Sequence, residues 1–121
     1  MVAELVARAE ERAEARRRTE AEREAKEQAR QQRERAAARA VYLADLAKRE
    51  EEAWGQVEAL IETKEQKNYD QAVQLLVDLR DLAARKQNIE QFKVRLSELT
   101  APHAKKPSFI SRLDRAGLPR G

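Results

Sequence analysis

Five cations in the last twenty residues are the side chains whose chemistry most plainly suggests a binding site. They are Lys105, Lys106, Arg112, Arg115 and Arg120. Residues 101–121 carry these five against Asp114 alone, a net charge of +4. Lysine and arginine contact phosphates and acidic partner surfaces. The alternative is a solvated face that balances the acidic middle of the chain, where residues 41–100 carry nine cations and twelve carboxylates.

Groups suited to catalysis or metal binding are sparse. The chain has no cysteine, which excludes disulfides, thiolate metal sites and cysteine nucleophiles. His103 is the only histidine, and we interpret it as a loop residue because no second ligand type lies near it in the sequence. Nearby serines lack a nucleophile elbow, and the three glycines are too far apart for a phosphate-binding loop. We therefore predict a protein that is not an enzyme, with no metal site and no cofactor.

Composition predicts an all-α protein. Charged residues make up 39% of the 121 residues and aromatic residues 4%, so any core must be small and aliphatic. Apart from Gly55, every glycine and proline lies in the last twenty residues, which leaves about a hundred residues almost free of helix breakers. No apolar run approaches the roughly 18 residues of a membrane-spanning helix. We expect a soluble, cytoplasmic protein.

Residues 1–40, which we call the arm, are predicted to form a charged helix. Between Val6 and Val41 no side chain is more apolar than alanine, and the segment consists mainly of strong helix formers. Pairs such as Glu14–Arg18 and Glu22–Lys26 have the favourable i,i+4 spacing. Residues 8–40 carry eleven cations and eight carboxylates, a net charge of +3. A solvated single helix, a nucleic-acid-binding arm and a coiled-coil contact through the alanines are the three interpretations.

Residues 41–118, the bundle, carry the apolar periodicity. The arm helix gains an apolar face at Val41 and is predicted to continue to about Lys67. The segments NYDQ (68–71) and NIEQ (88–91) each have the form of a capping box, with asparagine as N-cap and glutamine three residues later. The sequence thus predicts a long charged N-terminal helix followed by a compact bundle of three further helices.

The last of these helices is predicted from the stretch HAKKPSFISRLDRAGL, residues 103–118. Pro107 suits the first turn, Gly117 the left-handed position after the helix, and Leu113 and Leu118 the apolar pair of a Schellman motif. We predict a disordered tail at 119–121. The predicted core consists of Trp54, Tyr69, Leu76, Leu79, Phe92, Leu96, Phe109 and Leu113.

Two family resemblances accompany this pattern. Trp54, Val57 and Ile61, followed by Ala72, Leu76 and Leu79, resemble one tetratricopeptide-type (TPR-like) helical hairpin. Glu58 stands where that repeat has a small residue, and no closing proline follows Ala83. No peptide-binding residue is therefore carried over.

The second resemblance covers residues 40–118. The succession AWGQVEALIETK, YDQAVQLLVDLRDLA, FKVRLSEL and HAKKPSFISRLDRAGL resembles the C-terminal helical region of bacterial SWIM zinc-finger family proteins. The family's zinc module needs cysteines, which this chain lacks. The resemblance implies a detached helical accessory region that associates with protein or nucleic acid.

The function predicted from the sequence is a non-catalytic interaction module that mediates protein–protein association. The alternative is a nucleic-acid-binding accessory protein that uses the basic arm and the C-terminal cations. No membrane contact is expected, and the sequence identifies neither the partner nor the oligomeric state.

Overall fold

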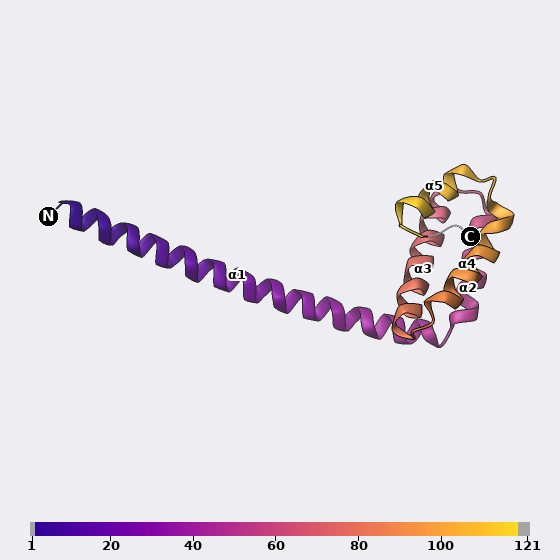
Figure 1. Ribbon diagram of the computed structural model, residues 1–121, viewed down its shortest axis with the longest axis horizontal. Helices are drawn as coiled ribbons and strands as arrows, with labels where there is room; N and C mark the ends of the chain where they lie inside the picture. The colour runs from indigo at the N-terminus through magenta and orange to yellow at the C-terminus, as the bar shows by residue number, and fades with distance from the viewer. Residues whose placement is uncertain (1, 119–121) are drawn as a thin grey trace. The chain divides into compact units, whose positions relative to one another are not determined.

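The computed structural model describes residues 2–118, and all of its regular structure is helical (Figure 1). The elements are α1 (Val2–Ala47), α2 (Glu50–Glu62), α3 (Gln66–Arg85), α4 (Ile89–Thr100), the short 3₁₀ helix η1 (Ala101–His103) and α5 (Pro107–Arg115). The predicted all-α fold, a long N-terminal helix followed by a compact helical bundle, is confirmed. The predicted disordered tail at 119–121 lies outside the described residues. Within residues 2–118, no helix is both long and apolar enough to cross a membrane.

The chain divides into two units, residues 1–40 and 41–121. In the first unit α1 is held by contacts along its own surface. Within the described chain, each side-chain hydrogen bond of residues 2–38 joins residues three or four positions apart. Glu14 pairs with Arg18 at 2.9 Å, as predicted, and Arg30 pairs with both Glu27 and Glu34. Helix propensity and these local pairs account for a helix that buries almost nothing.

The predicted continuous helix to Lys67 is interrupted at Lys48 and Arg49. Both residues form a turn, in which their amides donate to the carbonyls of Asp45 and Leu46 (3.0 Å each). Within the described residues, four α-helices therefore follow α1, rather than the predicted three. The sequence signal for the new helix is the triplet Glu50–Glu52, because carboxylates in a first turn interact favourably with the positive end of the helix dipole.

The predicted capping boxes are not formed. Helix α3 begins at Gln66, and Asn68 in its first turn donates its side-chain amide to Thr63 Oγ1 (2.9 Å). Asn88 does occupy the N-cap position of α4, but its side chain makes no capping hydrogen bond. The chain reverses there because Gln87 adopts a left-handed conformation (φ 57°). This lets the Asn88 amide donate to the carbonyl of Ala83 (2.9 Å), which closes α3 with a Schellman motif.

The core lies around α3, which packs against α2, α4 and α5. All eight predicted core residues are buried. Trp54 of α2 stacks obliquely on Phe92 of α4 (ring centroids 5.7 Å apart), and Tyr69 of α3 lies against Phe109 of α5 (5.8 Å). Each of these aromatic pairs joins two helices, so the few aromatic residues also set how the helices pack.

Helix α5 has the predicted ends. Pro107 is its first residue, and Gly117 follows it with φ 73°. The Leu118 amide donates to the carbonyl of Leu113 and the Gly117 amide to that of Asp114, both at 3.1 Å. Leu113 and Leu118 are buried, so the predicted Schellman motif is confirmed with its apolar contact.

We predict that Gly117→Ala destabilises the bundle by about 1 kcal/mol, the usual cost of a side chain in the left-handed region. A Cβ at this position would have no atom within 4 Å, so the cost arises from the backbone alone. The measurement is denaturant unfolding of the full chain followed by the fluorescence of Trp54, its single tryptophan. Lys105→Ala, at an exposed position of the same region, is the control and should change little. Equal midpoints for both variants would contradict the prediction.

The last residues of α1 belong to the second unit and are attached to α3. Leu43 and Leu46 are buried, and the Tyr42 hydroxyl donates to Oδ2 of Asp78 (3.0 Å). Asp78 is only 5% exposed and also accepts from the Gln74 amide (3.1 Å). Burial, followed by the hydrogen bond to Asp78 and the charge of that carboxylate, raises the pKa of Tyr42. Tyr42 of α1 thus donates a hydrogen bond to a buried carboxylate that lies thirty-six positions later in the chain.

We predict that Tyr42→Phe destabilises the bundle by about 1–3 kcal/mol, because Asp78 loses a hydrogen-bond donor in a buried position. A raised folded-state pKa stabilises the folded protein below the unfolded pKa of about 10 and loses that effect as the pH rises through the folded value. The difference in unfolding free energy between parent and variant should therefore shrink as the pH rises above about 10. Denaturant unfolding at several pH values, read by Trp54 fluorescence, checks this. A difference that grows with pH would contradict it.

Candidate functional site

His103 lies at the centre of the most unusual polar cluster in the bundle. It ends η1, is only 2% exposed, and packs edge-on against Phe109 (centroids 6.2 Å apart, 81° between planes). Its Nε2 is 2.7 Å from Oε1 of Glu58, and its Nδ1 is 2.8 Å from Nζ of Lys106. The residue that the sequence placed in a loop is therefore a buried side chain with a polar partner on each ring nitrogen.

The partners determine where the imidazole carries its proton. An ammonium group can only donate, so Lys106 donates to Nδ1 and that nitrogen acts as the acceptor. The proton of the neutral ring is then on Nε2, which donates it to Glu58. The result is a chain of hydrogen bonds from Lys106 through His103 to Glu58, which ties α2 to the segment before α5.

A second carboxylate lies beside the first. Glu62 follows Glu58 by one turn of α2, and its Oε1 is 3.9 Å from Nε2 of His103. The candidate ligand atoms of Glu58, Glu62 and His103 all lie within 4.8 Å of one another. The glutamate side chains are 44% and 59% exposed, so the cluster has a buried imidazole on one side and solvent on the other.

This cluster could not be predicted from the sequence because its members lie far apart along the chain. Glu58 and His103 are separated by 45 positions, and only the fold of α2, α4 and η1 brings them together. The i,i+4 spacing of Glu58 and Glu62 was visible, but such pairs are common on solvated helix faces. Nothing in the sequence indicated that His103 would face them.

The predicted C-terminal cations do not form one continuous free patch. Arg112 donates to Oδ1 of Asp70 (2.6 Å) and to Ser108, and its side chain is only 18% exposed. Lys106 is engaged by His103, as described above. Arg115 donates to the Ser111 hydroxyl (3.2 Å). Lys105 is exposed, and Arg120 lies outside the described residues. Two of the five cations therefore contribute to the packing of the bundle, and their predicted contact with a partner stays a prediction.

A small cleft between α2, α3 and α4 is another polar feature of the bundle. It has a volume of about 150 Å³, below the range of ordinary small-molecule sites, and its lining includes Trp54, Phe92 and Arg95. The guanidinium of Arg95 lies 4.9 Å from the centre of the Trp54 ring and forms two hydrogen bonds with Glu51 (2.6 and 2.5 Å). Those bonds lower the pKa of Glu51. The arrangement fixes Arg95 over the tryptophan.

Comparison with family models, curated proteins and solved structures gives no match for the chain.

Proposed function

We propose that this protein is a helical interaction module, without catalysis of its own, that associates with another protein through its arm. The proposal rests on the side-chain hydrogen bonds of residues 2–38 of the described chain, each of which joins residues three or four positions apart on the same helix. The side chains of this long helical surface are nearly all exposed. A long helical surface whose described side chains, at residues 2–38, bond only to neighbours on the same helix is suited to contact a partner.

The charge pattern of the arm indicates the kind of partner. Residues 8–18 carry five cations and three carboxylates (+2), residues 19–29 two cations and four carboxylates (−2), and residues 30–40 four cations and one carboxylate (+3). Each block spans about 16 Å of helix. A partner helix with acidic, basic and acidic blocks at the same spacing would be complementary along its length, which favours one register over others. Alanines between the charges allow close approach of such a helix.

We predict that Ala25→Pro abolishes the association. Proline in a helix interior costs about 3 kcal/mol and removes a backbone hydrogen bond, so the arm would break in its middle block. Ala25→Ser, which nearly preserves size and leaves the backbone intact, is the matched control. The measurement is quantitative mass spectrometry of proteins captured by each full-length variant, with Trp54 fluorescence to check that the bundle stays folded.

A partner recovered by the parent and the serine variant, but lost with the proline variant, would support the arm as the contact surface. The same partner recovered equally by all three would place the association on the bundle. An unrelated charged helix of equal length serves as the background capture. If the parent recovered no protein in greater amount than this background, the proposal would be wrong.

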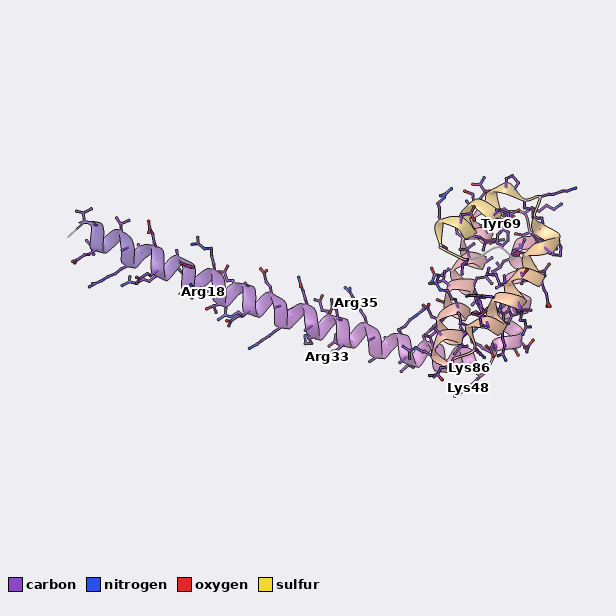
Figure 2. All side chains as sticks on the ribbon, viewed as in Figure 1. Arg18, Arg33, Arg35, Lys48, Tyr69 and Lys86 are labelled. Carbon is purple, nitrogen blue, oxygen red and sulfur yellow. The ribbon has the colours of Figure 1, made fainter. Side chains whose placement is uncertain are left out.

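Nucleic-acid binding is the second candidate function, and the free arginines of the arm favour it. Arg33 and Arg35 project from α1 without an ion pair to any described residue (Figure 2). Both lie in the most basic block of the arm. The neighbouring carboxylates reduce the field that a phosphate backbone would meet, which is why this candidate ranks below protein association.

We predict that duplex DNA binds only weakly, at micromolar concentration or above at physiological salt and without sequence preference. The logarithm of the affinity should fall with the logarithm of the salt concentration by about 0.9 per phosphate neutralised. Replacing Arg33 and Arg35 by glutamine should reduce that slope by about 2 in total. Fluorescence anisotropy across a salt series measures it. A sequence-specific complex at nanomolar concentration would favour nucleic acid over a protein partner.

A further inference from the structure

The cluster of Glu58, Glu62 and His103 has the donor set of a metal site. One imidazole nitrogen and two carboxylate oxygens, from α2 and η1, lie within 4.8 Å of one another. We propose that these three side chains bind a divalent transition-metal ion of the zinc or cobalt class, and that Lys106 competes with the ion for the imidazole.

The geometry needs only small adjustments to hold an ion. Ligand atoms about 2.0–2.1 Å from a tetrahedral ion lie about 3.4 Å from one another. The Nε2 of His103 is 2.7 Å from Glu58 and 3.9 Å from Glu62, so the first distance must open and the second must close. The glutamate side chains are partly exposed and can change rotamer, whereas the buried imidazole is held against Phe109. A rigid donor and two adjustable donors meet the requirement, and solvent can complete the coordination.

The mixture of ligand types selects the class of ion. Imidazole nitrogen together with carboxylate suits zinc, cobalt and other first-row transition metals. Calcium and magnesium prefer sites made of oxygen ligands alone, so they should bind weakly here. The charges of the two carboxylates balance that of a divalent ion, and their exposed side gives it a path from solvent.

Lys106 is what makes the site unusual. A histidine that ligates a metal normally donates its other ring N–H to a carboxylate or a carbonyl. Here that nitrogen, Nδ1, accepts from an ammonium group at 2.8 Å. Ligation through Nε2 requires the ring proton to be on Nδ1, which breaks the contact with Lys106. The lysine side chain is half-buried with a flexible stem and can move into solvent. Metal and lysine thus exclude each other at the same imidazole.

The test is a zinc titration of the full chain, purified without a histidine tag and followed by calorimetry. Glu62→Gln is the main variant, because Glu62 makes no short hydrogen bond to His103 and its loss should leave the fold intact. Glu52→Gln is the matched control, an exposed carboxylate in the first turn of the same helix. Lys106→Met removes the competing charge while leaving the backbone bond from the Lys106 amide to the His103 carbonyl available.

We expect one zinc ion per chain, with affinity at least about tenfold weaker in Glu62→Gln, unchanged in Glu52→Gln and about tenfold tighter in Lys106→Met. Cobalt should give a visible absorption band that zinc displaces. Because the chain has one histidine, the imidazole nitrogen signals in NMR spectra report directly whether the metal is on Nε2.

Two results would overturn the proposal. One is the absence of saturable zinc binding in both the parent and Lys106→Met. The other is equal zinc affinity in Glu62→Gln and Glu52→Gln. A weaker affinity in Lys106→Met would contradict the competing role of the lysine.

Discussion

Burial of the apolar face of α3 is the constraint on which the rest of the bundle depends. This helix contacts α2, α4 and α5, and the side chains that it buries are mostly aliphatic. The helices that pack on it are short, with 13 residues in α2, 12 in α4 and 9 in α5, and isolated helices of such length are marginal in water. Each is therefore stabilised by what it buries against α3 rather than by its own propensity. The arm differs, because its helix is stabilised by ion pairs between neighbouring turns and by residues of high helix propensity.

The end of α5 and the core residues could be predicted from the sequence. Gly117 could be assigned because a left-handed position after an apolar stripe, followed by leucine and proline, leaves few alternatives. The eight core residues followed from helical periodicity, which does not depend on where each helix meets its neighbour. The chain's two remaining left-handed residues among those described, Lys64 and Gln87, were not predictable in the same way. Neither is a residue type that prefers that conformation, and both are exposed residues just after a helix, where the chain turns toward the next one.

Competition between local signals explains where the sequence prediction was wrong. Asn68 looked like a cap, but the chain enters α3 two residues earlier and uses that asparagine to bond Thr63. The interruption at Lys48 and Arg49 was missed because the apolar pattern of Leu46, Ala53 and Val57 continues across it in register with one helix. Periodicity alone cannot distinguish one long helix from two short ones whose faces point to the same core. Contacts of the second helix with the rest of the bundle distinguish the two cases: Glu50 pairs with Lys86 at 3.1 Å, and Glu51 pairs with Arg95.

The polar cluster at His103 follows from the same dependence on packing. Burying an imidazole with both nitrogens satisfied stabilises the link between α2 and η1, and removing either partner would leave a buried polar atom without one. That structural role explains why Lys106 and Glu58 lie where they do. It does not require Glu62, whose carboxylate lies near the ring without a short hydrogen bond to it. A purely structural role of His103 leaves this second carboxylate unused, whereas the ligation proposed above would use it.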